Sequence, residues 1–529
     1  MLDTIIKGGL VVDGSGQPGR VADVGLEGDR IAAVGDLKDA TAGETVDATG
    51  LVVAPGFIDL HTHSDFSLLV NGAAESQVHQ GVTFEVVGNC GHSCAPVVDA
   101  EAVKHAIFGH RDCVPIDWHG FGQYLDRLEA QALGVNVAAL VGHGTIRLNV
   151  LGGAQRAASP DEVTAMERLL DGALEEGAIG FTTGLEYSPG NSARVEEILA
   201  LCQVAGKHDV MYATHVRNRD YFYEQGFGEA LAMARRAGVK LQISHITPKF
   251  GAPPHATEHT MEMIRWTRET GADVGFDMIP HEWGPTTMTA VLPPWAFEGG
   301  VTKLLDRLRD PETRERLKQN PLPIWKLVPA GHWDKLVLFQ SQENADLTGL
   351  TFAEIGRRRG VHPYDAILDL LLEEGEGLYN VTWVGELVST SDLLMTMHEP
   401  DCGLISDTIT LAPYGELGDV KWAPSSYGWT ARVLGRYVRD EGVFTLEEAV
   451  HRITALPASR LGLSDRGALR EGAFADVTVF DAGTITDLSD LKAPNIYPSG
   501  IRHVLVNGRF AMRDGERTPV NAGRVVRRH

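Results

Sequence analysis

The middle of the chain alternates between short apolar segments and amphipathic helical stretches, and this alternation constrains the fold more than any other feature. We predict strands at residues 57–61, 82–88, 136–142, 178–182, 210–214, 240–244, 273–278 and 402–406. Between them, residues 161–177 and 226–238 carry apolar residues at helical spacing, which predicts helices. Such alternation is typical of parallel strands joined by crossover helices. Eight strands fit an α/β protein with a closed (β/α)8 TIM-like barrel, and the alternative is an open doubly wound sheet.

The two ends of the chain have a different sequence pattern from the middle. Residues 3–55 contain short apolar clusters separated by Gly- and Asp-containing turns. Residues 475–480 and 504–508 look similar, and the second of these segments enters an Asn-Gly turn. Asn and Gly supply the backbone conformations that tight hairpin turns require. We therefore predict that both ends build one small β domain.

These boundaries divide the chain into a small β-sandwich made from residues 1–55 and 466–529 and a barrel made from residues 56–465. The gap between predicted strands seven and eight is long, with a Pro-rich start and a charged stretch after it. We expect residues from about 285 to 400 to be an insertion that carries its own helices.

Charge and cysteine content limit the class of partner and the compartment. The chain of 529 residues has a formal net charge of −24, which argues against a nucleic-acid or anionic-membrane partner. Its five cysteines are scattered and do not resemble a disulfide framework, which favours a reducing compartment. The N-terminal segment lacks the features of a signal peptide, and no apolar run is long enough to span a membrane. We therefore expect a cytoplasmic protein.

Side chains that can bind a metal recur at the carboxyl ends of the predicted strands, where barrel active sites lie. These residues are His61, His63, Cys90, His215, His245 and Asp407. Alternate residues of a strand share a face, so His61 and His63 can point at one ion. Each residue alone fits an ordinary structural role, but their recurrence at corresponding strand ends is hard to obtain by chance. Imidazole and thiolate suit Zn²⁺, and a carboxylate opposite the metal suits proton transfer.

Other motifs that would indicate a different chemistry are weak or missing. Cys90 and Cys94 have the spacing of half a structural zinc site, but no second cysteine pair completes it. The sequence contains no phosphate-binding loop, no dinucleotide-binding fingerprint with its acidic partner and no G-x-S-x-G nucleophile motif after a strand. These absences remove nucleotide-dependent enzymes and serine hydrolases from consideration.

Several motifs, in order along nearly the whole chain, resemble the amidohydrolase superfamily and, within it, the N-acyl-D-amino-acid deacylases (D-aminoacylases). The motifs are Pro55-Gly56-Phe57-Ile58-Asp59-Leu60-His61-Thr62-His63, Gly88-Asn89-Cys90-Gly91, Gly184-Leu185-Glu186-Tyr187-Ser188-Pro189-Gly190, Ala213-Thr214-His215-Val216-Arg217-Asn218 and Ile243-Ser244-His245. Many amidohydrolases share the first motif. The cysteine and the Gly-Leu-x-Tyr-x-Pro-Gly run are specific to the deacylase branch.

The resemblance implies a metal site, a reaction and roles for particular residues. It implies a tight zinc site formed by Cys90, His215 and His245. It also implies a weaker second site formed by His61 and His63, which Cys90 and Asp407 can reach. In such enzymes metal-bound water attacks the amide carbonyl, and by resemblance Asp407 takes the proton of the water and delivers it to the leaving amine. Tyr187 corresponds to the phenol that polarises the carbonyl oxygen.

The chain departs from the family pattern where the substrate carboxylate is expected to bind. Deacylases usually carry a His-Pro-Arg element after the last strand, and this chain has Ala423-Pro424-Ser425 there. Lys249 is displaced from its usual position, and Arg219 stands where an acidic residue is usual. We therefore expect hydrolysis of a C–N amide with an altered substrate, unless Arg217, Arg219 or Lys249 compensates. The candidate substrate-binding residues are His143, Arg217, Lys249 and His281.

The sequence leaves three functional alternatives open. The first is a deacylase of linear N-acyl amino acids. The second keeps the metal chemistry but acts on a cyclic amide, a carbamate or a xenobiotic amide without a free α-carboxylate. The third is an inactive metal-binding protein, against which the complete ligand set argues. We expect a small-molecule substrate, and the sequence leaves the oligomeric state open, a homo-oligomer included.

Overall fold

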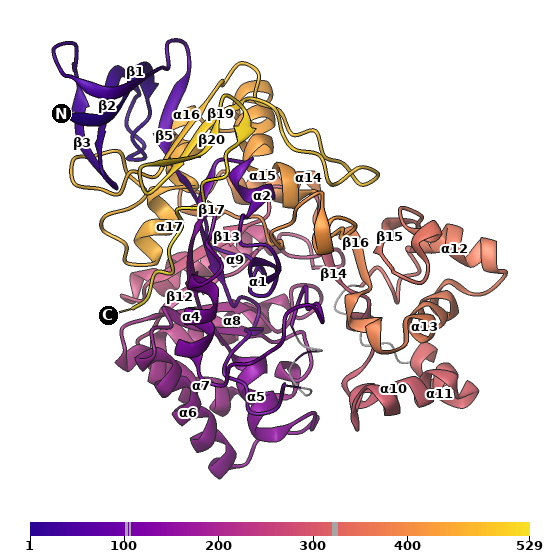
Figure 1. Ribbon diagram of the computed structural model, residues 1–529. Coiled ribbons are helices and arrows are strands. Elements are labelled where there is room, and N and C mark those ends of the chain that lie inside the picture. Colours follow the sequence, from indigo (N-terminus) through magenta and orange to yellow (C-terminus); the bar gives the residue numbers. More distant parts are fainter. Residues whose placement is uncertain (101–103, 105–106, 320–325, 529) are drawn as a thin grey trace.

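Parallel strands occupy the centre of the protein, which has a mixed α/β architecture (Figure 1). The computed structural model describes residues 1–100, 104, 107–319 and 326–528. One parallel sheet has the order β6-β7-β8, and a second has the order β17-β13-β12-β11-β10-β9. Their bounds are β6 Phe57–Asp59, β7 Val82–Val87, β8 Asn136–Ala139, β9 Val141–Gly142, β10 Gly180–Gly184, β11 Met211–His215, β12 Lys240–Ile243, β13 Val274–Met278 and β17 Cys402–Leu404. Each of the eight predicted strands overlaps an observed one, and the third is divided into β8 and β9.

These central strands are buried on both faces, which explains their nearly continuous apolar sequence. Every residue of β7, β11 and β13 is buried. Parallel strands that are covered on both faces have no solvent-facing side to favour polar residues. A polar side chain at the end of such a strand is therefore a candidate functional residue, and His215 at the end of β11 is an example.

Helices between the strands cover the parallel sheets (Figure 1). They include α4 Phe121–Glu129, α5 His143–Leu151, α6 Pro160–Glu175, α7 Val195–Lys207, α8 Tyr223–Ala237 and α9 Ala256–Glu269. The start of α6 has a capping box, because the Ser159 hydroxyl accepts a hydrogen bond from the Glu162 amide and the Glu162 carboxylate accepts one from the Ser159 amide. Met166 and Leu170 on its inner face are buried. The amphipathic pattern of residues 161–177 thus predicts this helix to within two residues at each end.

The two ends of the chain pair with each other in one nine-stranded sheet, seen where the indigo and yellow segments meet in Figure 1. β18 pairs with β5 in an antiparallel arrangement, which joins the C-terminal strands to the N-terminal ones. The sheet has the order β21-β20-β19-β18-β5-β1-β2-β3, with β4 paired to β1. The bounds are β1 Leu2–Val11, β2 Arg20–Glu27, β3 Arg30–Gly35, β4 Ala42–Asp47, β5 Val52–Pro55, β18 Val477–Phe480, β19 Ile501–Val506, β20 Arg509–Arg513 and β21 Glu516–Arg517.

The segment between β13 and β17 projects to one side of the molecule (Figure 1). It contains helices, as predicted, and also a three-stranded antiparallel sheet of order β14-β16-β15, which the sequence pattern did not reveal. The bounds are β14 Trp283–Thr287, α10 Gly300–Arg309, α11 Pro311–Gln319, β15 Leu336–Gln340, α12 Phe352–Arg359, α13 Pro363–Glu374, β16 Thr382–Glu386 and α14 Thr390–Met397. Apart from several short 3₁₀ helices, the described residues also form α1 Ser67–Val70, α2 Glu75–Val78, α15 Ser425–Ala431, α16 Leu446–Arg452, α17 Ala455–Arg460 and the π-helix η8 Arg432–Asp440.

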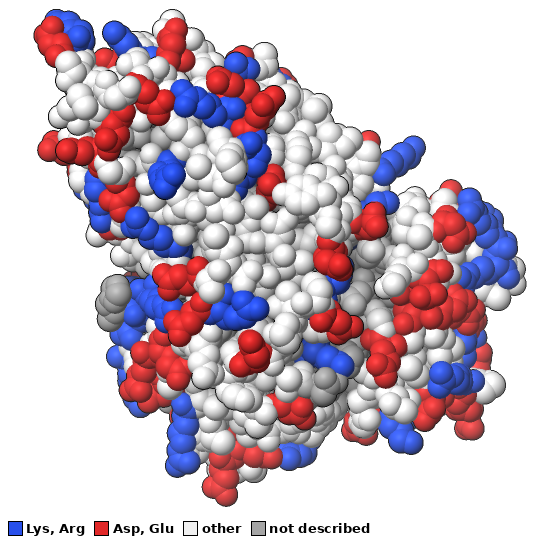
Figure 2. All heavy atoms as spheres, viewed as in Figure 1, with Lys and Arg blue, Asp and Glu red and all other residues white. Residues whose placement is uncertain are grey.

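The charged residues do not separate into regions of one sign on the face seen in Figure 2. Lys and Arg lie interspersed with Asp and Glu there, and a broad uncharged area occupies the middle of that face. Within the described residues, no helix is both long enough and apolar enough to cross a membrane.

Candidate metal centre

Six side chains that can ligate a metal meet at the carboxyl ends of the parallel strands. His61 and His63 follow β6, Cys90 follows β7, His215 ends β11, and His245 and Asp407 follow β12 and β17. Cys90, His245 and Asp407 have φ angles of 49°, 37° and 53°. A left-handed conformation is uncommon for residues other than glycine, and such residues concentrate at functional sites. These turns therefore orient the three side chains, and the surrounding contacts must offset the conformational strain of the backbone.

Buried carboxylates below the site hold these turns in place. Asp277 accepts a hydrogen bond of 2.7 Å from the His245 amide. Asp59 accepts hydrogen bonds from the amides of His61, at 3.3 Å, and Ser406, at 3.2 Å. Burial raises the pKa of both Asp59 and Asp277 to about 6. The ligand-bearing turns are thus anchored through their backbones, which leaves their side chains available to the site.

The first donor group consists of Cys90, His215 and His245. The Cys90 sulfur lies 3.7 Å from Nδ1 of His215 and 3.4 Å from Nε2 of His245. Tetrahedral zinc, with Zn–S about 2.3 Å and Zn–N about 2.0–2.1 Å, would separate sulfur and nitrogen by roughly 3.5 Å. The observed spacing and the donor types therefore fit a zinc ion.

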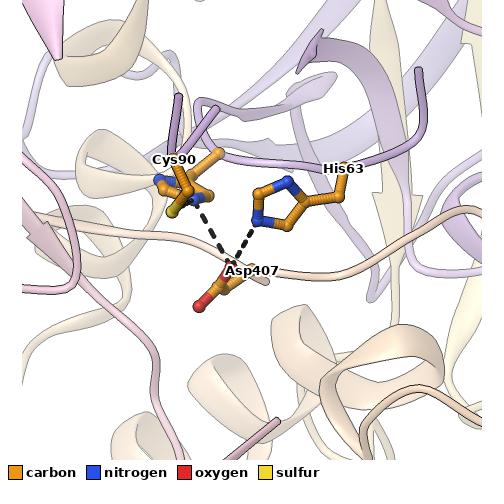
Figure 3. Close-up of side chains that lie close together, drawn as sticks. His63, Cys90 and Asp407 are labelled. Carbon is orange, nitrogen blue, oxygen red and sulfur yellow. Dashed lines mark hydrogen bonds and ion pairs between the residues drawn. The ribbon is translucent and has the colours of Figure 1, made fainter. Parts of the chain in front are cut away.

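The second donor group consists of His61, His63, Cys90 and Asp407, and it shares the cysteine with the first. Nε2 of His63 lies 3.1 Å from Oδ1 of Asp407, and Nε2 of His61 lies 3.4 Å from the same oxygen. In Figure 3 the side chains of His63 and Cys90 face Asp407. The ligating atoms within each of the two groups lie within 4.8 Å of one another. The shared sulfur makes the two groups neighbouring halves of one site.

The charges of the site suit a divalent cation. Burial alone would raise the pKa of Cys90, but the imidazoles of His61 and His245 hold it well below the usual thiol value, which favours the thiolate. Burial would likewise raise the pKa of Asp407, but His61 and His63 hold it well below its usual range. Nδ1 of His61, His63 and His245 is buried and has no hydrogen-bond partner among the described residues. The anionic donors and the inward Nε2 atoms thus converge on the same space.

The sequence and fold as a whole match known amidohydrolases. The family model described as "Amidohydrolase family" matches residues 44–292 and 400–512, which is more than half of the chain. The chain belongs to the amidohydrolase family. This membership confirms the prediction of a metal-dependent hydrolase.

The proteins most similar to this amidohydrolase include deacylases that match it along nearly its whole length. An N-acyl-D-glutamate deacylase of Alcaligenes xylosoxydans xylosoxydans is 37% identical over 511 residues, which cover 96% of this chain and 93% of the relative. A solved N-acyl-D-glutamate deacylase of Bordetella bronchiseptica, in complex with zinc and a phosphonate mimic of the tetrahedral intermediate, has a TM-score of 0.82 at 32% identity, with 100% of both chains covered. A solved D-aminoacylase, described by its binuclear metal centre with one-metal activation and second-metal attenuation, has a TM-score of 0.83 at 32% identity and the same coverage.

Glu186 contacts His215 of the first donor group at the ring nitrogen that does not face Cys90. Its Oε2 lies 2.5 Å from Nε2 of His215 and 2.5 Å from Nζ of Lys249. Burial would raise the pKa of Glu186, but Lys249 and His215 hold it at about 2. A carboxylate on the second nitrogen of a metal-binding imidazole fixes its orientation and raises its basicity. This contact could not be predicted from the sequence, because it joins a loop after β10 to His215 at the end of β11 and to Lys249 after β12.

We expect Glu186→Gln to weaken zinc binding about 10- to 100-fold, since a neutral amide balances neither the His215 N–H nor Lys249 as well as a carboxylate. Competitive titration of the metal-free protein with zinc and a chelator measures this change. Glu258→Gln, at an exposed site on α9, serves as the control. Equal zinc affinity in the two variants would contradict a role of Glu186 in holding the ligand.

The candidate substrate-binding residues have different positions in the structure. His143 is buried, and its Nε2 lies 2.7 Å from Glu197. Arg217 is bound to Glu229 at 3.0 Å, and Lys249 is bound to Glu186. His281 is buried, and burial together with Arg432 and Arg436 holds its pKa well below the usual value. None of these four residues lines the small pocket that is bordered by His215, His245 and Asp407. None of them lines the cavity of about 880 Å³ that Tyr187 also borders.

Tyr187 lies where the metal pocket meets a large cavity. Its ring centroid lies 4.8 Å from that of His215. The small pocket is lined by Tyr187, His215, Arg219, His245 and Asp407 among others. The cavity, of about 880 Å³, is lined by Tyr187 and by apolar residues that include Phe108, Leu148, Leu292 and Phe297. Tyr187 is therefore part of the wall of both the small pocket and the large cavity.

Proposed function

We propose that the protein hydrolyses the amide bond of an N-acyl-D-amino acid in a zinc-dependent reaction. The observation that carries this proposal is that one cysteine, Cys90, is shared by two groups of metal-ligating side chains, one of which includes the carboxylate of Asp407. The names of the similar proteins, N-acyl-D-glutamate deacylase and D-aminoacylase, support the choice of substrate class.

We propose that Cys90, His215 and His245 hold the tight zinc ion and that His61, His63, Cys90 and Asp407 form a weaker site. Zn²⁺ supplies Lewis acidity and lowers the pKa of water when it is bound. Burial lowers the pKa of His63, but its hydrogen bonds and charge interactions with Asp407 and Cys90 together outweigh burial and raise the pKa to about 9. A proton therefore competes with a metal at His63, which supports weaker binding in the second group.

The chain's own residues supply proton transfer and carbonyl polarisation in this proposal. The Asp407 carboxylate takes a proton from the water that attacks the carbonyl and then delivers it to the leaving amine, which is a poor leaving group unless protonated. Burial and the nearby charges of Cys90 and Asp407 raise the pKa of Tyr187 well above the usual phenol value. The phenol therefore stays protonated and can donate a hydrogen bond to the carbonyl oxygen as negative charge develops on it.

We further propose that the two parallel sheets close into one (β/α)8 barrel. The amide of Leu140, between β8 and β9, donates to the Val87 carbonyl, and Thr62 after β6 pairs with Thr408 after β17. These links at both edges support closure. We likewise propose that residues 1–55 and 466–529 form a β-sandwich and that residues 56–465 form the barrel.

The cellular setting and the partners are also proposals. All five cysteines, which lie among the described residues, are free of disulfides, and this supports a reducing compartment such as the cytoplasm. The mixed charges of the face in Figure 2 support a small-molecule substrate rather than a nucleic acid. The oligomeric state is left open, with a homo-oligomer among the alternatives.

A substrate panel tests the proposed function. The panel contains N-acetyl-D- and N-acetyl-L-amino acids with acidic and neutral side chains, together with hydantoins, carbamates and anilides. We expect the highest kcat/KM for an N-acetyl-D-amino acid, loss of this activity on chelation, and its return with zinc. Turnover of hydantoins, carbamates or anilides alone would favour the second functional alternative. No turnover of any compound by the zinc-loaded protein would favour the inactive one.

A further inference from the structure

Three cations near the site can bind an anionic group of the substrate, and the structure separates them by their partners. Arg217 uses Nε and Nη2 on Glu229, at 3.0 and 3.1 Å, and donates to the carbonyls of Asn191 and Ala193 at 3.0 Å. Lys249 is bound to Glu186 at 2.5 Å. Both charges are thus balanced by carboxylates of the protein.

Arg219 differs from the other two. Its side chain is buried, with 3% of the residue exposed, and it lines the small pocket together with His215, His245 and Asp407. Nη1 donates to the His245 carbonyl, and within the described residues Nε has no hydrogen-bond partner.

No carboxylate of the described chain forms an ion pair with this guanidinium. Glu186 is near enough to be affected by Arg219, but its Oε2 already receives His215 and Lys249. A buried charge without a partner is costly, and that cost falls when an anion completes the site. Nε and Nη2 form the side of a guanidinium that binds a carboxylate through two parallel hydrogen bonds.

We propose that Arg219 binds the α-carboxylate of the N-acyl amino acid and so determines substrate specificity. This inference rests on the proposed hydrolysis of such a substrate. The carboxylate then lies in the pocket that Asp407 and Tyr187 also line, a short distance from the amide that is cleaved. The cavity of about 880 Å³ on the other side of Tyr187 has room for the remainder of the substrate.

The test compares an N-acetyl-D-amino acid with its α-carboxamide, which keeps the scissile amide but removes the negative charge. We expect the wild-type enzyme to prefer the acid by on the order of 10²- to 10³-fold in kcat/KM, mostly through KM. In Arg219→Gln this preference collapses towards equality, and in Arg219→Lys it is partly restored. Arg236→Gln, which makes the same chemical change at an exposed site in the last turn of α8, is the control and is expected to retain the preference.

A second measurement does not depend on turnover. Calorimetry with the metal-free protein gives the Kd of the acid and of the carboxamide, and we expect Arg219→Gln to lose the difference between them. Zinc content and thermal melting of each variant verify folding. Equal kcat/KM for acid and carboxamide in the wild-type enzyme, or an unchanged preference in a folded Arg219→Gln variant, overturns the inference alone. Failure of the wild-type enzyme to cleave either compound overturns the proposed function as well, and the two failures are therefore distinguishable.

Discussion

Asp407→Asn is expected to lower kcat about 10²- to 10⁴-fold, the range that a positioned general acid and base contributes. The amide nitrogen and oxygen of asparagine have nearly the size of the carboxylate but can neither take a proton nor deliver one to the amine. Asp407 is not a member of the Cys90, His215 and His245 group. Zinc bound by that group is therefore expected to remain while turnover falls.

Steady-state kinetics and metal analysis on the same preparation measure both parts of this expectation. Asp346→Asn, in the short 3₁₀ helix Ala345–Leu347 of the insertion, is the matched control, because it makes the same chemical change outside the site. A kcat within threefold of wild type in Asp407→Asn would show that another group moves the proton. Loss of the zinc from Asp407→Asn would instead assign this residue to the tight site.

Cys90→Ser is expected to abolish measurable hydrolysis and to weaken zinc binding by at least about 10²-fold. The serine hydroxyl is a much poorer zinc ligand than a thiolate, since it does not ionise near neutral pH. The effect is expected to exceed that of any single histidine variant, because the sulfur belongs to both donor groups.

Zinc titration and the rate with an N-acetyl-D-amino acid verify this result. Cys94→Ser is the control, since Cys94 is buried four residues away and belongs to neither donor group. Full zinc occupancy and activity in Cys90→Ser would show that the thiolate is needed neither for zinc binding nor for hydrolysis. An equal loss in Cys94→Ser would indicate a general effect of polar substitution in this region.

The strands and the donor residues could be predicted from the sequence because both leave local patterns. Strands buried on two faces give unbroken apolar runs, and a polar ligand directly after such a run, as at His215, stands out. The same reasoning identified Cys90 and Asp407 as candidates before any contact was known. The structure places their side chains close together, and the roles assigned to them remain predictions that the variants above test.

Contacts between loops could not be predicted, because no periodicity encodes them. The pairing of Arg217 with Glu229 and of Lys249 with Glu186 depends on how loops fold over the strand ends. The loop position of Lys249 gave no indication that it would be buried. The antiparallel sheet of the insertion could not be predicted, because its strands β14, β15 and β16 are far apart in the chain and no short hairpin turn marks their pairing.

The segment between β13 and β17 has a consequence for how new specificities can arise. It contributes Leu292, Phe297, Val301 and Tyr379 to the wall of the large cavity, whereas none of the six donor residues lies within it. The proposed metal ligands and part of the wall of the large cavity are thus encoded by separate stretches of the gene. Exchanging this segment between homologues is a route to retargeting the enzyme that leaves its metal ligands untouched.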